Sequence, residues 1–432
     1  MHKKITFFWF RRDLRLEDNT ALYKALNGAN PVQCVFIFDT TILSKLRDKK
    51  DSRVTFIFDR IHHLHQELKE RGSSLLVKIG EPVDIWEKLS QTYTIEDVWT
   101  NRDYEPYAQQ RDKEVYELLK KKGIGFRGMR DHVIFEKSEV MKDDGTPYMV
   151  FTPYSKKWKK QFTEKRIQEF SSAHINNWHS SNFALPSLGQ IGFAYYRQAD
   201  HLPRINSSVI TKYHETRDLP AVQGTTRLGV HLRFGTISVR QVIKSGLQNE
   251  KYLNELIWRE FYAMILYHYP HVVGRSFNPK YDALGWLNDE SDFERWKSGC
   301  TGIPLVDAGM RELNQTGYMH NRVRMVVASF LVKHLLVDWR WGESYFAEKL
   351  LDFELASNNG GWQWAAGTGV DAAPYFRVFN PVSQAKKFDP KSEYIKSWVP
   401  EVLSSKYPKP IVELSFGRNR CLEWYKSALL KR

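Results

Sequence analysis

The periodicity of the apolar residues changes once along the chain, and this change limits the possible folds more than any other feature. Up to about residue 130, short runs rich in β-branched and aromatic residues alternate with stretches of helical period. We expect strands at residues 5–10, 32–38, 74–79, 98–100 and 125–126, and helices at residues 54–71 and 112–122. Strands that alternate with helices across short turns predict a doubly wound parallel sheet.

After residue 211 the apolar pattern is helical throughout, most clearly at residues 252–267, 302–316, 320–336 and 345–351. Between the two regions the pattern decays, and turn-forming and Ser/Asn/His-rich segments dominate. A basic run at residues 156–160 lies there, and we interpret it as a solvated helix face. Because 432 residues exceed one typical domain, the sequence predicts an α/β domain at 1–130, a linker at 131–208 and an all-helical domain at 209–432.

The charge balance favours an anionic partner. Lys and Arg total 64 against 50 Asp and Glu, which gives a net charge of +14. Such a field attracts polyanions such as nucleic acid or an anionic membrane, although some enzymes are basic without binding either. The chain also has 14 Trp, 21 Tyr and 25 Phe, which either fill a large core or stack on bases or on a flat cofactor.

Several classes of protein are excluded by what the sequence lacks. No apolar run approaches the roughly 20 residues that cross a bilayer, and the first apolar run meets Arg11 and Arg12 too soon for a signal peptide. We therefore expect a cytoplasmic protein with no membrane partner. The three cysteines are far apart and lack CxxC spacing, so neither a disulfide framework nor a metal site is expected. No GxGxxG follows the first run, which argues against an ordinary dinucleotide fold.

Two segments of the helical region carry residues suited to a ligand. Residues 223–229 read Gln-Gly-Thr-Thr-Arg-Leu-Gly, a segment that can hold a diphosphate or simply cap a helix. Glu255, Trp258 and Arg259 share one helix face, where they can bind a base-like ligand. The alternative for this face is an amphipathic helix with one internal ion pair.

Two further segments add candidates. Asn321, Arg322 and Met325 cluster at a later helix start, although Met325 alone is equally typical of core packing. Residues 352–364 contain tandem Asn, tandem Gly and two Trp. This composition is unusual for a helix interior, so we expect a turn pressed against a ligand.

Taken together, these motifs resemble the DNA photolyase/cryptochrome family. The resemblance rests on residues 9–19 (Trp-Phe-Arg-Arg-Asp-Leu-Arg-Leu-Glu-Asp-Asn), 255–262, 319–325 and 358–379, in the family's order, and it runs to about residue 389. Within the family the chain is most similar to class I cyclobutane pyrimidine dimer photolyases. The resemblance implies a helical domain that binds a U-shaped FAD, and DNA containing pyrimidine dimers as the substrate of a monomeric enzyme. It also implies that reduced FAD, excited by blue light, passes an electron to the dimer and regains it after the ring splits.

The resemblance also assigns roles by position. It places the FAD tail at Tyr213, Thr225, Thr226, Arg227, Leu228 and Gly229. It places further flavin contacts at Arg259, Asn321, Arg324, Asp352, Glu354 and Asn358, with Asn358 facing flavin N5. It assigns the dimer pocket to Arg217, Glu255, Trp258, Asn321, Arg322, Met325 and Trp364. The catalytic residues that it implies are Glu255, Met325 and Asn358. It implies an electron relay through Trp362, Trp339 and Trp286.

The chain departs from the family pattern at three places. Glu354 stands where many relatives have Asp, and Tyr252 stands where bacterial relatives have Trp. Tyr107-Ala108 stands where folate-type antenna sites have an Asn-Glu pair, which counts against a folate antenna. The identity of a second antenna chromophore is left open by the sequence.

Three activities are compatible with the resemblance. The expected one is light-dependent repair of cyclobutane dimers, the reaction of a deoxyribodipyrimidine photo-lyase. The first alternative is a blue-light-sensing cryptochrome. Asn358 and the absence of a long tail after the helical region count against it. A (6-4) photolyase is the second, against which Met325 counts, because such enzymes place histidine there.

Overall fold

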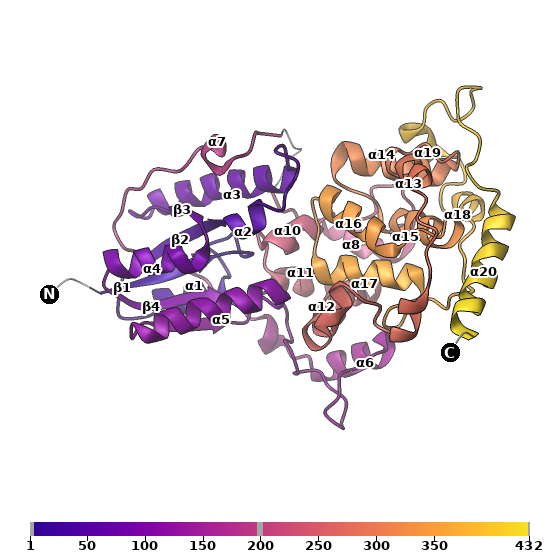
Figure 1. Ribbon diagram of the computed structural model, residues 1–432. Coiled ribbons are helices and arrows are strands. Elements are labelled where there is room, and N and C mark those ends of the chain that lie inside the picture. The colour runs from indigo at the N-terminus through magenta and orange to yellow at the C-terminus, as the bar shows by residue number, and fades with distance from the viewer. Residues whose placement is uncertain (1–3, 197–201, 431–432) are drawn as a thin grey trace. The chain divides into compact units, whose positions relative to one another are not determined.

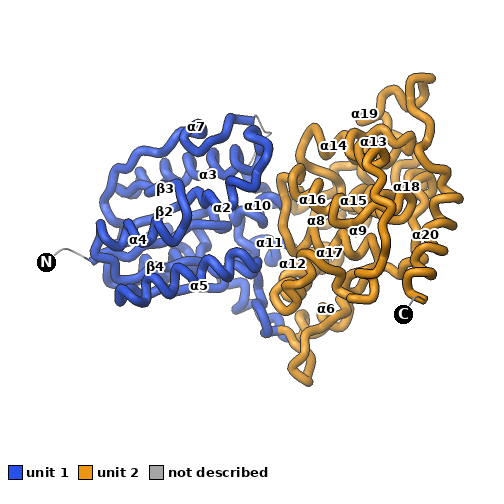
Figure 2. The backbone as a smooth tube through the Cα atoms, viewed as in Figure 1, with its two compact units in different colours: residues 1–139, 161–205, 228–245 blue, residues 140–160, 206–227, 246–432 orange. Residues whose placement is uncertain are grey.

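The computed structural model describes residues 4–196 and 202–430. It divides into two compact units, which Figure 2 shows in different colours. Unit 1 comprises residues 1–139, 161–205 and 228–245, and unit 2 comprises residues 140–160, 206–227 and 246–432. Across the described residues, no helix is long and apolar enough to cross a membrane.

Unit 1 is built on a five-stranded parallel sheet with the order β3-β2-β1-β4-β5. The strands are β1 (Ile5–Phe10), β2 (Val32–Asp39), β3 (Leu76–Gly80), β4 (Ile95–Asn101) and β5 (Gly125–Met129). Every residue of β1 and β2 is buried, as expected for central strands covered on both faces. The predicted doubly wound parallel sheet is therefore confirmed.

Helices complete unit 1 (Figure 1). They are α1 (Thr20–Leu26), α2 (Thr40–Leu43), α3 (Ser52–Lys69), α4 (Pro82–Thr92), α5 (Pro106–Lys121), η1 (Glu164–Ile167), α7 (Leu188–Ile191), α10 (Gly229–Phe234) and α11 (Val239–Gly246). Helices α4 and α5 lie side by side against the sheet. Between α4 and the sheet, the Trp86 ring meets Phe7 and Trp9 edge-on, each at 5.6 Å between centroids.

A buried ionic network ties α11 to the segments that follow β1 and β5 in unit 1. The guanidinium of Arg240 donates to Asp18 and to Asp131, both at 2.8 Å, and Arg15 donates to Asp131 at 2.5 Å. Burial alone would raise the pKa of Asp131, but the positive charges of Arg15 and Arg240 outweigh it and lower the pKa well below its ordinary 3.8. The carboxylate is therefore charged, paired and fully enclosed.

We expect Asp131→Asn to lower the free energy of unfolding by about 3 kcal/mol, because removing one partner of a buried pair leaves the others uncompensated. The stabilisation from Asp131 is complete above its unfolded pKa of 3.8 and is lost as the pH falls below that value. Urea unfolding between pH 7 and pH 3 measures both effects. Asp143→Asn is the control, because Asp143 is exposed and its ion pair with Lys157 lies at the surface. Equal stability of the two variants at pH 7 would contradict the prediction.

Unit 2 is helical, as the periodicity predicts. Its helices are α6 (Phe151–Gln161), α8 (Ser207–Thr211), α9 (Tyr213–Thr216), α12 (Glu250–His268), η2 (Pro270–Val273), η3 (Pro279–Ala283), α13 (Glu290–Ser298), α14 (Pro304–Thr316), α15 (Asn321–Ser329), the π-helical turn η4 (Phe330–His334), α16 (Trp339–Lys349), α17 (Leu355–Ala366), α18 (Pro381–Phe388), α19 (Glu393–Trp398) and α20 (Leu414–Leu430). Its largest core lies among α13, α14, α15, α16 and α17, around residues such as Trp296 and Trp339.

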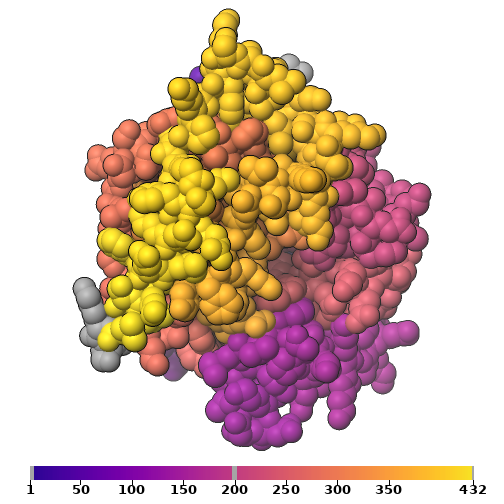
Figure 3. Space-filling view, turned by 90° about the vertical axis from the view of Figure 1, so that its right-hand side faces the viewer, coloured from indigo at the N-terminus to yellow at the C-terminus, as the bar shows by residue number. Residues whose placement is uncertain are grey.

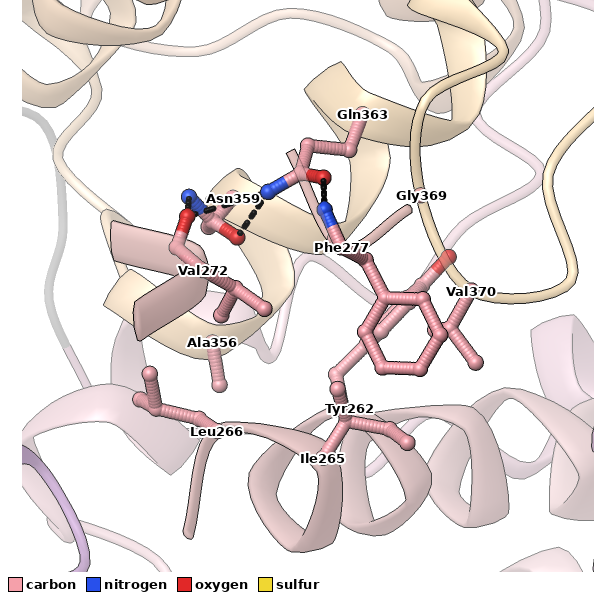
Figure 4. A pocket seen from close by; sticks show the side chains of 11 residues that line it. Tyr262, Ile265, Leu266, Val272, Phe277, Ala356, Asn359, Gln363, Gly369 and Val370 are labelled. Carbon is pink, nitrogen blue, oxygen red and sulfur yellow. Dashed lines mark hydrogen bonds between the residues drawn. The ribbon is translucent and has the colours of Figure 1, made fainter. Parts of the chain in front are cut away.

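The expectation of a turn across residues 352–364 is wrong, because most of this run forms α17. The glycine at 360 is required by packing: a Cβ there would lie 2.3 Å from the Tyr262 ring of α12. The polar residues satisfy buried backbone groups. Asn359 and Gln363 both donate to the carbonyl of Val272, at 2.9 and 3.0 Å, and bond each other at 3.1 Å (Figure 4).

Candidate active site

A cavity of about 390 Å³ opens in unit 2 among α12, α15, α16 and α17. This volume falls within the range of cofactor and small-molecule sites, about 300–1,000 Å³. Figure 3 shows one face of unit 2, and a hollow is visible there beside the magenta residues near 150. Of the residues predicted from sequence, the cavity gathers Arg217, Glu255, Trp258, Arg259, Asn321, Arg324, Met325, Asp352, Glu354, Asn358, Trp362 and Trp364.

Glu255 is held at the cavity by an arginine. The guanidinium of Arg217 donates to its carboxylate at 2.6 Å. Burial raises the pKa of Glu255, and the charge of Arg217 only partly offsets this effect. A carboxyl group in this setting takes up a proton more readily than an exposed glutamate, so it can donate a hydrogen bond as well as accept one.

Arg322 is predicted to bind substrate but is not among the lining residues. Its guanidinium donates to Asp218 at 2.8 Å and lies 4.3 Å from the centre of the Phe388 ring. It also reaches within 3.9 Å of the Met325 sulfur, which does line the cavity. Arg322 therefore stands beside the cavity and keeps contact with one of its walls.

Among the described residues that line the cavity, three arginines are paired with carboxylates. In addition to the Arg217–Glu255 pair, Arg324 donates hydrogen bonds to both carboxylate oxygens of Asp352, at 2.9 and 3.2 Å. Arg259 donates to Glu354 at 2.9 Å. Glu354, where the chain departs from the family's Asp, thus reaches an arginine of α12.

Asn358 is fixed by a residue that the sequence analysis missed. Its Nδ2 donates to the carboxylate of Glu343 at 3.0 Å and to the Glu343 carbonyl at 3.1 Å. Burial raises the pKa of Glu343. No local signal marks Glu343, because a glutamate within an amphipathic helix is ordinarily exposed.

The predicted relay tryptophans lie in different parts of the core of unit 2. Trp362 is almost fully buried, and its ring approaches Phe346 at 4.9 Å and Trp296 at 6.1 Å. Trp339 is buried at the start of α16, and the Trp286 ring lies 6.3 Å from Tyr425.

The predicted FAD-tail segment lies outside the lining of the cavity. Thr225 and Thr226 bond the hydroxyls of Tyr318 and Tyr252, at 3.2 and 3.1 Å. Arg227 has a left-handed backbone with φ of 52°, a strained conformation that is common at ligand clamps.

The ends of the predicted tail segment belong to other elements. Tyr213 begins α9 and meets the Tyr252 ring edge-on at 5.1 Å. Leu228 and Gly229 begin α10, which belongs to unit 1.

Comparison with known proteins places these features in a family. Residues 6–172 match the family described as DNA photolyase, and residues 252–405 match the FAD binding domain of DNA photolyase. The deoxyribodipyrimidine photo-lyase of Vibrio cholerae is 37% identical, over 97% of this chain and 99% of its own. That of Halobacterium salinarum is 35% identical, over 98% of both chains. The chain belongs to the DNA photolyase family.

Solved structures of photolyases agree with this assignment. A bacterial class III photolyase from Agrobacterium tumefaciens superposes with a TM-score of 0.87 at 30% identity, covering 99% of this chain and 98% of its own. An archaeal photolyase from Sulfolobus tokodaii, solved with two FAD molecules, gives 0.86 at 36% identity, covering 98% and 99%. The family expected from the motifs is confirmed.

The residues of the photolyase cavity fit FAD. The indole Nε1 of Trp362 is buried at the cavity and has no hydrogen-bond partner among the described residues, so it is a donor that a polar atom of a bound ring system can use. The arginines supply donors for carbonyl and phosphate oxygens, and Asn358, whose Nδ2 already donates to Glu343, supplies its Oδ1 as an acceptor. A Cβ at Gly361 would meet no atom within 4 Å, so glycine keeps this part of the lining open.

We therefore expect Gly361→Leu to lower the FAD content of the purified protein strongly, because the new side chain enters the cavity from α17. Gly361→Ala is the matched variant: it adds one methyl group and should retain more FAD. Flavin absorbance per protein measures the content, and circular dichroism checks the fold, which leucine favours over glycine in a helix. A folded Gly361→Leu protein with full FAD would contradict this placement.

Proposed function

We propose that this protein is a deoxyribodipyrimidine photo-lyase, which uses light and FAD to repair cyclobutane pyrimidine dimers in DNA as a monomer. The observation that carries the proposal is that one cavity is lined both by residues expected to bind a dimer and by residues expected to bind the flavin ring. Glu255 and Met325 stand for the first set, and Asn358 and Asp352 for the second. The proposed role of each follows from its contacts.

The dimer-binding residues act on bases that have left the duplex. Extrusion costs a few kcal/mol and is easiest for a badly paired lesion. Trp258 and Trp364 form aromatic walls for the extruded pair. Glu255, held at the cavity by Arg217 at 2.6 Å, hydrogen-bonds the edge of a base next to the carbonyls on which negative charge develops.

The flavin-binding residues position the cofactor, which when bound supplies an electron to the dimer under blue light and recovers it afterwards. Arg324 and Asp352 lie beside the ring system, with Arg259, Asn321 and Glu354 as further contacts. Tyr213 and the segment from Thr225 to Gly229 hold the tail. Because Asn358 donates to Glu343, its Oδ1 is the atom left to face flavin N5.

Two further features belong to the proposal. The net charge of +14 holds DNA phosphates. A second, light-harvesting chromophore is supported by the Sulfolobus tokodaii relative, whose structure holds two FAD molecules. A cytoplasmic location stays a prediction.

Repair of defined lesions tests the function. We expect the protein with reduced FAD to repair a cyclobutane thymine dimer under blue light and to leave a (6-4) product unrepaired. The (6-4) reaction also transfers an oxygen group between bases, which calls for a proton donor that the Met325 thioether cannot supply. Chromatography of both oligonucleotides after illumination measures the outcome. Efficient (6-4) repair, or no dimer repair in the light, would overturn the assignment.

The same assay tests the assigned role of Glu255 through the variant Glu255→Ala. This variant should lower the yield of dimer repair more than it lowers the FAD content, because the carboxyl group is assigned to the substrate.

The relay tryptophans have a separate readout. If Trp362 passes electrons toward the flavin, Trp362→Phe should largely abolish photoreduction of oxidised protein in the presence of an external thiol. Repair by protein already carrying reduced FAD should persist, because that reaction does not use the relay. The same substitution at Trp339 or Trp286 should slow photoreduction in turn, as measured by flavin absorbance. Unchanged photoreduction in all three variants would assign these residues to the core alone.

A further inference from the structure

One wall of the cavity has a second aromatic layer that the residues assigned so far do not explain. The Trp258 indole lies face to face with the Phe151 ring, at 3.8 Å between centroids and with 5° between the planes. Phe151 is the first residue of α6, far from α12 in the sequence. Because Trp258 also lines the cavity, the indole that stacks on Phe151 presents part of its surface to a ligand there.

Helix α6 holds Phe151 firmly in this place. Trp158, fully buried, donates from Nε1 to the Glu260 carboxylate of α12 at 2.6 Å. Tyr154 packs against Phe261 of α12 at 5.2 Å between ring centroids. At the start of α6, the Phe151 amide donates to the Asp371 carboxylate at 3.0 Å. The second layer is therefore anchored by polar and apolar contacts along α6 and by the hydrogen bond of the Phe151 amide.

This anchoring matters for binding. A side chain that is free to rotate loses conformational entropy when a ligand fixes it, whereas a pre-oriented one does not. Parallel rings in full overlap are not the arrangement that an isolated aromatic pair prefers, so the surrounding packing imposes it. The imposed stack fixes the plane of the indole before any base arrives.

We propose that Phe151 is a positioning residue for lesion recognition: it fixes the indole plane of Trp258 and thereby sets the affinity for the extruded dimer. The proposal rests on the proposed function. It requires that Phe151 act through Trp258, whereas a residue that merely fills space would affect the whole unit.

A double-mutant cycle in the dark separates these two roles. The variants are Phe151→Leu, which keeps apolar bulk without a flat ring, Phe151→Tyr, which keeps the ring, Trp258→Ala, and Phe151→Leu with Trp258→Ala. Phe416→Leu is the matched control, because Phe416 is exposed on α20. Fluorescence anisotropy gives the dissociation constants for a dimer-containing and an undamaged oligonucleotide, and flavin absorbance gives the FAD content.

Phe151→Leu should weaken binding of the dimer oligonucleotide about three- to tenfold, the scale of one ordered aromatic contact. Undamaged DNA should bind as before, and FAD content should not change. Phe151→Tyr and Phe416→Leu should stay close to the unmodified protein. In the Trp258→Ala background, Phe151→Leu should have no further effect.

Three results would overturn the inference. These are an unchanged dimer preference in Phe151→Leu, an equal loss in Phe151→Tyr, or an undiminished effect without Trp258. If Phe151→Leu does not fold, Phe151→Met gives the same contrast with tyrosine. Failure of the proposed function looks different, because the unmodified protein would then bind both oligonucleotides equally; that result would remove both proposals.

Discussion

The close approach of α17 to α12 at Gly360 is the contact on which the site in unit 2 depends. A side-chain atom at this position would lie 2.3 Å from the Tyr262 ring, so any other residue would require either that ring or the two helices to move. Helix α12 carries Glu255, Trp258 and Arg259, whereas α17 carries Asn358, Trp362 and Trp364. The distance between the two helices therefore also sets the distance between the side chains assigned to the dimer and those assigned to the flavin.

Helix α17 uses two faces for two purposes. On one face, Asn359 and Gln363 lie one helical turn apart, and both donate to the backbone of η2. Gln363 also accepts a hydrogen bond from the Phe277 amide, which follows η2, at 2.8 Å (Figure 4). Elsewhere on the helix, Asn358 and Gly361 line the cavity. Buried amides with complete hydrogen bonding fix one orientation of a helix, and here they aim its other residues into the cavity.

The sequence predicts the architecture well and the details of the site only in part. Parallel strands and amphipathic helices leave periodic patterns, so the sheet of unit 1 and most helices of unit 2 follow from them. Helix α17 does not, because two polar residues, Asn359 and Gln363, interrupt its buried face and its two glycines serve packing and cavity space. Glu343 and Phe151 also escape prediction, since each is marked only by a contact with a residue of another helix, Asn358 and Trp258 respectively. The motifs do indicate the residues that line the cavity, because ligand chemistry limits which side chains can serve there.

The charges of the cavity follow one rule. Each carboxylate among Glu255, Asp352 and Glu354 is paired with an arginine, which avoids the large penalty of an isolated buried charge. Such pairs are fixed dipoles, and they need little reorganisation when charge appears on a neighbouring ligand. A reaction that moves one electron out and back creates charge only briefly. Preoriented pairs stabilise this charge from the moment it forms, whereas water dipoles would first have to reorient. The arginine–carboxylate pairs are therefore as much a part of the proposed chemistry as the aromatic walls.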